Sequence, residues 1–283
     1  GFHGLVLAGS DLANLYPPQD TSDQILADGF KAAARSHPET LIRALALPPQ
    51  TNVIRRSAVL IAVGHWLTAR FGKMLRLSEI GCSAGLNLHW DFYAMDAAGV
   101  QFGPRGSAVH LAPDWRGTPP VLCPAYIHEA QGVDLAPPDI TSPDARRRLM
   151  SYLWPDQQDR LTLTQAGLSI AAQPDTDGTV TQGDALDWLP GRLTHKPPYL
   201  HLIYSTVAWR YLSDRDQARG AQMIADHGAQ ATDQAPLAWF QMENDGAPDS
   251  AALTLRLWPG DITLSLGRAD FHGRWVDWTA PPP

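Results

Sequence analysis

From Leu75 onward, short apolar segments that resemble β-strands alternate with segments that have the apolar spacing of helices. This alternation predicts a mostly parallel β-sheet with helices on both faces, because parallel strands are usually joined by a helical crossover. Residues 251–269 instead alternate apolar and polar side chains around a Pro-Gly-Asp turn, which predicts an antiparallel hairpin. With this hairpin, we expect a doubly wound α/β sheet of seven strands. The first five strands are expected within residues 74–81, 125–135, 178–182, 199–205 and 236–244.

The first 72 residues show no strand pattern. Residues 21–37 and 55–72 both carry apolar side chains at helical spacing, and the second segment ends at a glycine, as helices often do. We therefore expect a helical N-terminal appendage at residues 1–72 and a Rossmann-like domain at residues 73–283. The chain begins with a glycine, so we expect the natural N-terminus to lie upstream.

Secondary structure is predicted from less regular patterns in three further segments after residue 84. A helix is predicted at residues 85–95, directly after the first strand. Residues 99–123 are rich in Gly and Pro and are predicted to be irregular, apart from a short strand at 107–112. The segment GRWVDWT, residues 273–279, is expected to extend the second strand of the hairpin.

The composition argues against several classes of partner. The formal net charge is −7, from 22 Lys and Arg against 29 Asp and Glu, so a nucleic-acid partner is not expected. No apolar run approaches the roughly 18–20 residues needed to span a bilayer. Cys82 and Cys123 are too few for a disulfide scaffold or a thiolate metal site, and no metal is predicted. We expect a cytoplasmic protein that acts on a small molecule, and the sequence does not indicate its oligomeric state.

The segment EIGCSAG, residues 79–85, carries the most specific chemical signal. Gly81 would let the chain turn sharply out of the strand, and Gly85 would let the next helix pack closely. The start of that helix would offer free N–H groups to an anion. Glu79 is an unusual charge in an apolar strand, and its burial requires a partner such as an ammonium group or backbone N–H groups.

Two further acids follow later strands. Asp134 ends a strand, where a carboxylate can accept hydrogen bonds from ribose hydroxyls. Asp184 follows a short strand and opens a helix, and for this residue alone a helix cap is the more frequent role. An acid at three strand ends in chain order is a stronger signal than any one acid.

The order E-x-G-x-x-x-G, G-x-D, G-D-A and a final hairpin resembles the class I S-adenosylmethionine-dependent methyltransferases over residues 75–278. Five blocks also resemble, in order, the DUF2332 family of uncharacterised bacterial proteins: EIGCSAGLNLHWDFY, GVDLAPPDI, LWPDQQDRL, GDALDWL and ADFHGRWVDW. Three departures stand out. Ser83 replaces the middle glycine of the methyltransferase loop, and Cys82 and Phe92 replace residues typical of the DUF2332 family. The family name carries no reaction, so it supports the fold more than the function.

The methyltransferase resemblance implies S-adenosylmethionine as cofactor. By this resemblance Glu79 would hold the loop or meet the cofactor's amino group. The other implied cofactor contacts follow the strand ends. They are the methionine end at Gly81, Ser83 and Gly85, the ribose at Asp134, and the adenine at Asp184 and Ala185.

The methyl acceptor is less constrained. A transferase must hold the acceptor in line with the sulfonium methyl group, and some use a general base. Tyr204 and Ser205 end a strand, and His272 could act as a base near neutral pH. These three residues are the catalytic candidates, and none of them identifies the acceptor.

Two alternatives remain open at this point. The segment GCSAG also fits the G-x-S-x-G turn of serine hydrolases, in which Ser83 would attack with Asp184 or Asp214 and His272 as partners. Against it, only helices precede the strand, and no upstream glycine-rich oxyanion segment is evident. The second alternative is a protein that has kept the fold and binds a nucleotide-like ligand without turnover.

Overall fold

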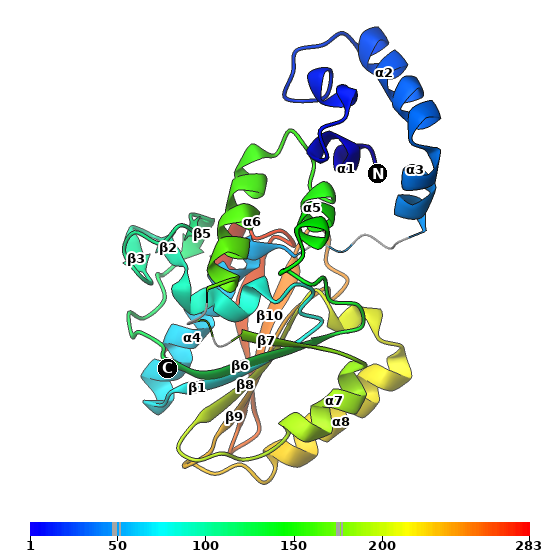
Figure 1. Ribbon diagram of the computed structural model, residues 1–283. Helices are drawn as coiled ribbons and strands as arrows, with labels where there is room; N and C mark the ends of the chain where they lie inside the picture. Colours follow the sequence, from blue (N-terminus) through cyan, green and yellow to red (C-terminus); the bar gives the residue numbers. More distant parts are fainter. Residues whose placement is uncertain (47–49, 51, 174–175, 177) are drawn as a thin grey trace.

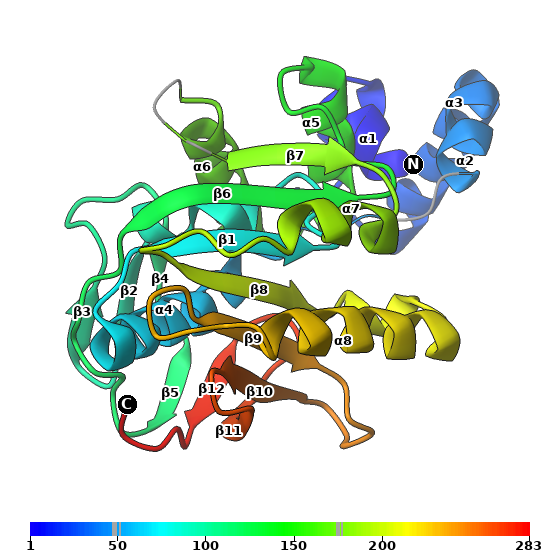
Figure 2. The ribbon, with the colours of Figure 1, turned by 90° about the horizontal axis from the view of Figure 1, so that it is seen from below.

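The computed structural model describes residues 1–46, 50, 52–173, 176 and 178–283. Its centre is a mixed α/β domain with a nine-stranded sheet in the order β5-β12-β11-β10-β9-β8-β1-β6-β7 (Figures 1 and 2). Five neighbouring strands are parallel to one another. They are β1 (Leu75–Ile80), β6 (Ile127–Asp134), β7 (Gly178–Gln182), β8 (Leu200–Thr206) and β9 (Leu237–Glu243).

The strand order places a reversal of the chain beside β1. From β1 the chain adds β6 and then β7 on one side, and it then returns to add β8 and β9 on the other side. In open parallel sheets, ligands bind outside the carboxyl ends of the strands at such a reversal. The fold therefore directs attention to the residues that follow β1, β6 and β8.

The antiparallel part of the sheet is larger than the sequence predicts. The expected hairpin is present as β10 (Ala251–Trp258) and β11 (Ile262–Ala269). Residues 273–279 do not extend β11, because the chain reverses at Gly273, where φ is +71°, and forms a separate antiparallel strand, β12 (Trp275–Trp278). The strand β5 (Asp114–Gly117) pairs with β12. The seven-strand prediction is therefore wrong by two strands, β12 and the edge strand β5.

Helices cover both faces of the sheet. On one face α4 (Ser57–Phe71) and α6 (Gln158–Ala171) pack in the main hydrophobic cluster with side chains such as Leu77 and Leu202. On the other face α7 (Ala185–Arg192) and α8 (Asp214–Gly228) pack around Ile203 and Leu237. Figure 2 shows α7 and α8 in front of the strands and α4 behind them. Alternate side chains of each buried strand thus enter two different cores.

The N-terminal helices form a separate small cluster. They are α1 (Phe2–Leu7), the 3₁₀ helix η1 (Asp11–Asn14), α2 (Asp23–Ser36) and α3 (Pro38–Leu45). This appendage meets the rest of the protein through α1, which contacts α5 (Pro143–Ser151), and His3 Nδ1 lies 2.8 Å from the Leu153 carbonyl oxygen. The helix α4 packs against the sheet although it precedes residue 73. The predicted domain boundary therefore does not coincide with the boundary between the hydrophobic clusters.

The segment after β1 differs from the expected helix. Residues Leu86–Phe92 form a 3₁₀ helix, η3, which is interrupted at His89, and the chain then enters β2 (Ala94–Ala97). With β3 (Val100–Phe102) and β4 (His110–Leu111), β2 forms a second, three-stranded sheet. Only β4 was expected in this region. The remaining 3₁₀ helices are η2 (Ile54–Arg56) and η4 (Trp209–Tyr211). Within the described ranges, no helix is long and apolar enough to cross a membrane.

Candidate functional site

A cavity of about 310 Å³ opens at the carboxyl ends of β1, β6, β7 and β8. It lies at the strand reversal, where the topology places ligand sites in sheets of this kind. Of the residues that the sequence singles out as cofactor contacts, Gly81, Ser83, Asp134, Asp184 and Ala185 line it. The other lining residues are Gln50, Arg56, Ile80, Val133, Leu135, Gly183, Thr206, Val207, Ala208, Tyr211 and Leu212.

The turn after β1 is tightly packed against the turn after β8. Gly81 has φ +70°, and a Cβ atom at this position would lie 2.5 Å from the Cβ atom of Ala208. The amides of Gly81 and Cys82 both donate to the Val133 carbonyl oxygen, at 2.9 and 3.1 Å. Gly85 also has a positive φ, but it packs against Val180 of β7 and does not line the cavity. Gly81 makes the sharp turn out of the strand that the sequence predicts, and of these two glycines only Gly81 lines the cavity.

Two non-glycine residues of the cavity wall have left-handed backbone conformations. Ser83 has φ +51° and Val207 has φ +56°. A positive φ is especially rare for a β-branched residue such as valine, and strained residues of this kind cluster at functional sites. The Ser83 hydroxyl is buried and has no hydrogen-bond partner among the described residues. The cavity wall therefore contains two residues with strained backbone and, among the described residues, a hydroxyl group without a hydrogen-bond partner.

Asp134 joins the end of β6 to the turn after β1. Its Oδ2 atom accepts a hydrogen bond from the Ser83 amide at 2.8 Å. Its Oδ1 atom accepts from the Ala136 amide at 3.0 Å and from Gln50 Nε2 at 3.4 Å. The carboxylate is therefore fixed in orientation while it lines the cavity, as a group that receives ribose hydroxyls would need to be.

Asp184 has the capping role that the sequence favours. Its Oδ1 atom accepts a hydrogen bond from the Leu186 amide at 2.8 Å and caps α7. The residue is exposed and lines the cavity on the side opposite β8. The cap holds this carboxylate at the cavity edge, so the structural role and a ligand role are compatible.

Glu79 lies behind the loop and does not line the cavity. It is 2% exposed, and its Oε2 atom lies 3.5 Å from the Tyr204 hydroxyl, which acts as a donor. Burial raises the pKa of Glu79 to about 8, against the opposing effects of Tyr204, Arg56 and Asn87. Glu79 is therefore protonated at neutral pH in the folded protein. This placement favours the loop-holding role over direct contact with a ligand.

A set of hydrogen bonds from Asn52 and from the start of α4 fixes the loop, and the sequence patterns do not predict it. Asn52 Nδ2 donates to the Cys82 carbonyl oxygen at 3.1 Å, and Asn52 Oδ1 accepts from the Leu86 amide at 3.1 Å. The Ser57 hydroxyl donates to Asn87 Oδ1 at 2.8 Å. The first amide of η3 is thus already bonded to protein, and η3 is only one short 3₁₀ helix. The Leu86 amide is therefore not available to an anion at the start of η3.

Arg56 is a further residue of the site that the sequence patterns do not predict. Its Nε donates to the Phe271 carbonyl oxygen and its Nη1 to the Thr206 carbonyl oxygen, both at 2.8 Å. Burial lowers the pKa of Arg56 to about 10, although Glu243, Tyr211 and Glu79 act to raise it. Within the part of the chain that the structure describes, Arg56 forms no ion pair. The cavity wall therefore carries a desolvated positive charge that an anionic ligand group could compensate.

The three catalytic candidates do not converge at the cavity. Tyr204 and Ser205 are fully buried, and the Ser205 hydroxyl donates to Glu243 Oε1 at 2.9 Å. The same Glu243 oxygen accepts from the Ala208 amide at 3.0 Å, so Glu243 braces the turn after β8. His272 is exposed on the turn after β11. Tyr204 and Ser205 therefore lie in the support of the site, and none of the three lines the cavity.

The groups of a serine hydrolase are not assembled in this structure. The Ser83 hydroxyl bonds to no histidine of the described chain, and Asp184 is engaged as a helix cap. Asp214 is the first residue of α8, where an acidic side chain favours the start of a helix. No three His, Cys, Asp or Glu side chains within the described ranges are grouped as they would be around a metal ion.

Comparison with known proteins assigns the chain to a family. The family model described as "Uncharacterized protein conserved in bacteria (DUF2332)" matches residues 1–278. Neither the curated proteins nor the solved structures include a match. The match extends across the N-terminal appendage, the cavity and the β12 strand, so it covers nearly the whole chain. The chain therefore belongs to the DUF2332 family of uncharacterised bacterial proteins.

Proposed function

We propose that the cavity binds S-adenosylmethionine and that the protein is a methyltransferase with a small-molecule acceptor. One observation carries the proposal. The turn after β1, the carboxylate that ends β6 and the carboxylate that follows β7 border one cavity, in the chain order that the methyltransferase resemblance implies. This arrangement suits a nucleoside joined to an amino acid, because each part meets a different strand end.

The residues of the cavity fit the chemical parts of this cofactor. Asp134 would accept hydrogen bonds from the ribose hydroxyls, and Asp184 with the Ala185 backbone would meet the adenine. Arg56 provides a half-buried cation without an ion pair among the described residues, and it would compensate the cofactor's carboxylate. The Ser83 hydroxyl would gain the hydrogen bond that it lacks within the described chain.

When bound, S-adenosylmethionine supplies an electrophilic methyl group on its sulfonium. The protein's contribution would be to orient the acceptor along the line of attack and to exclude water, since positioning alone can supply much of a rate enhancement. Leu135 and Tyr211 line the cavity and are 71% and 80% exposed, so an apolar and an aromatic side chain stand at its mouth. Such side chains suit contact with a flat ring of the cofactor or of the acceptor.

The proposal is tested by the Asp134→Ala variant. The affinity for S-adenosylhomocysteine, measured by calorimetry, is expected to fall about 10- to 100-fold, which corresponds to the loss of one or two charge-assisted hydrogen bonds. Asp187→Ala is the matched control, because Asp187 is an exposed acid on α7 that does not line the cavity. Equal affinities of the two variants for S-adenosylhomocysteine would contradict the proposed ribose contact.

A further inference from the structure

A second cavity, of about 460 Å³, lies beside the first. It is bordered by Arg55, His110, the first turns of α6 with Asp159 and Thr162, and the turn with Gly273 and Arg274. The two cavities are connected through consecutive residues, because Arg56 lines the first and Arg55 the second. The turn after β11 accepts a hydrogen bond from Arg56 at the Phe271 carbonyl oxygen, and its Gly273 lines the second cavity.

Arginine side chains gather at the second cavity. Arg55 pairs with Asp159, and Arg274 pairs with Asp270 through Nε and Nη2 at 2.9 and 2.7 Å. Arg160 does not line the second cavity but a small neighbouring one, which it shares with Arg55. It donates to the amide oxygen of Gln157 at 2.5 Å and pairs with no carboxylate of the described chain. Two guanidinium groups therefore line the second cavity and a third lies close by, in a chain whose formal net charge is −7.

Neighbouring arginines contribute to lowering the pKa of Arg55 and of Arg160. Burial first, and then the neighbouring Arg274, lowers the pKa of Arg55, while Asp270 opposes the shift. Burial, Arg55 and Arg274 likewise lower the pKa of Arg160, again against Asp270. Asp159 and Asp270 compensate part of this positive charge, and a bound anion would compensate it further.

Two more features favour an anion at this place. The cavity lies at the N-terminus of α6, a helix of 14 residues, where the helix dipole favours negative charge. The carboxylate of Asp159 already occupies part of this position beside Arg55, and its side chain is 63% exposed. An exposed carboxylate of this kind is held weakly and can give way to a ligand that offers a better geometry.

We propose that the second cavity binds the oxyanion group, a phosphate or a carboxylate, of a small-molecule ligand, and that this group displaces Asp159 from Arg55. The arginine fork presents parallel donors that match either oxyanion. We identify this ligand with the methyl acceptor. This identification rests on the proposed function, whereas the anion binding does not. Such an acceptor would extend from the second cavity past Arg55 and Arg56 toward the first cavity.

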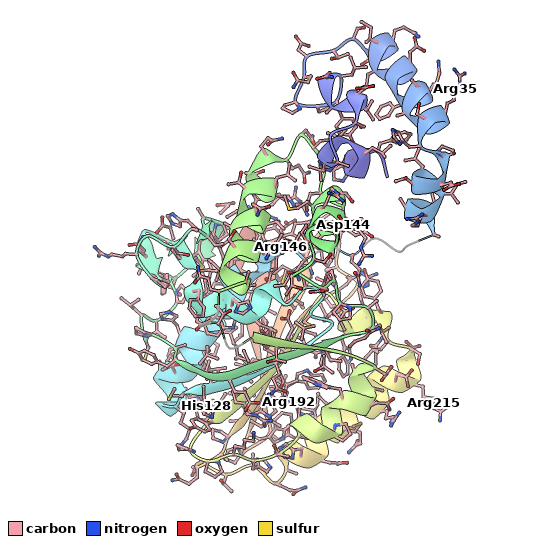
Figure 3. The ribbon with its side chains drawn as sticks, in the orientation of Figure 1. Arg35, His128, Asp144, Arg146, Arg192 and Arg215 are labelled. Atoms are coloured by element: carbon pink, nitrogen blue, oxygen red, sulfur yellow. The ribbon has the colours of Figure 1, made fainter. Side chains whose placement is uncertain are left out.

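Calorimetric titration with inorganic phosphate and with succinate tests this site. We expect one of the two to bind with a stoichiometry of one, and the stronger of them identifies the oxyanion. Arg55→Gln is expected to weaken that binding about tenfold, and Asp159→Asn to strengthen it about tenfold, because one variant removes a donor and the other removes the competing carboxylate. Arg215→Gln on α8 is the control of equal charge change, and Figure 3 shows it far from α6.

The outcomes separate this proposal from the cofactor proposal. Binding of neither anion to the wild-type protein would overturn the second site, as would equal affinity in Arg55→Gln, Asp159→Asn and Arg215→Gln. The thermal unfolding midpoint of each variant shows whether the variant is folded. If Arg55→Gln does not fold, Asp159→Asn still tests the site, because the Asp159 side chain is exposed and its substitution should leave the fold intact. S-adenosylhomocysteine titrated into Arg55→Gln should bind as it does to the wild type, since Arg55 does not line the first cavity.

Discussion

Raising the pH from below 4.5 to above 8 is expected to destabilise the wild-type protein by about 5 kcal/mol relative to Glu79→Gln. The pKa of Glu79 is raised from 4.5 to about 8 in the folded protein, chiefly by burial. Between these two values the unfolded state binds fewer protons than the folded state. The stability that comes from the neutral carboxyl group is therefore fully present below pH 4.5 and is lost as the pH rises through about 8.

The comparison with Glu79→Gln isolates this effect. Glutamine keeps the shape and an oxygen that can accept from the Tyr204 hydroxyl, but it does not ionise. Burial lowers the pKa of His65 and His89 to about 4, so these groups add stability as the pH rises from about 4 to 6.5 in both proteins. The free energy of unfolding of each protein, measured with urea across this pH range, gives the difference in stability between the wild type and Glu79→Gln. Parallel curves for the two proteins would contradict a protonated Glu79.

Gly81→Ala is expected to destabilise the protein by about 2–5 kcal/mol and to weaken ligand binding in the first cavity. Part of this cost is the left-handed backbone at φ +70°. The larger part arises because the new methyl carbon would lie 2.5 Å from the Ala208 Cβ atom, so that the turn after β8 must move. Both turns line the cavity, and the same movement distorts it.

Gly72→Ala provides the matched control for Gly81→Ala. Gly72 ends α4 with φ +61°, and a Cβ atom at that position would meet nothing within 4 Å. This variant should therefore show only the conformational cost of about 1–2 kcal/mol. The free energies of unfolding of both variants, measured with urea, separate the cost of the left-handed backbone from the cost of the contact with Ala208. If the two glycines cost the same free energy, the contact between the turns after β1 and β8 would not be tight.

Much of the parallel sheet could be predicted because its strands carry local signals. All seven residues of β8 are buried, and the corresponding apolar run is visible in the sequence. The hairpin of β10 and β11 follows from its alternation around the Pro-Gly-Asp turn. The pairing of β5 with β12 has no such signal, because residues such as Asp114 and Trp275 are far apart in the chain.

The candidate site was predictable where a residue stands at a strand end. Gly81, Asp134 and Asp184 could be identified because parallel strands bring their carboxyl ends to one edge. Asn52 and Arg56 could not, since they precede α4 and reach the loop only through the packing of that helix on the sheet. Their one local signal is that polar residues stand directly ahead of an almost entirely apolar helix.

Calorimetric titration of the wild-type protein with S-adenosylmethionine, S-adenosylhomocysteine and methylthioadenosine tests whether the first cavity binds this cofactor. We expect the first two to bind one to one. We expect methylthioadenosine to bind about tenfold or more weakly, because it lacks the carboxylate that Arg56 would receive. If the protein binds none of the three nucleosides, the assignment of the first cavity to this cofactor is wrong.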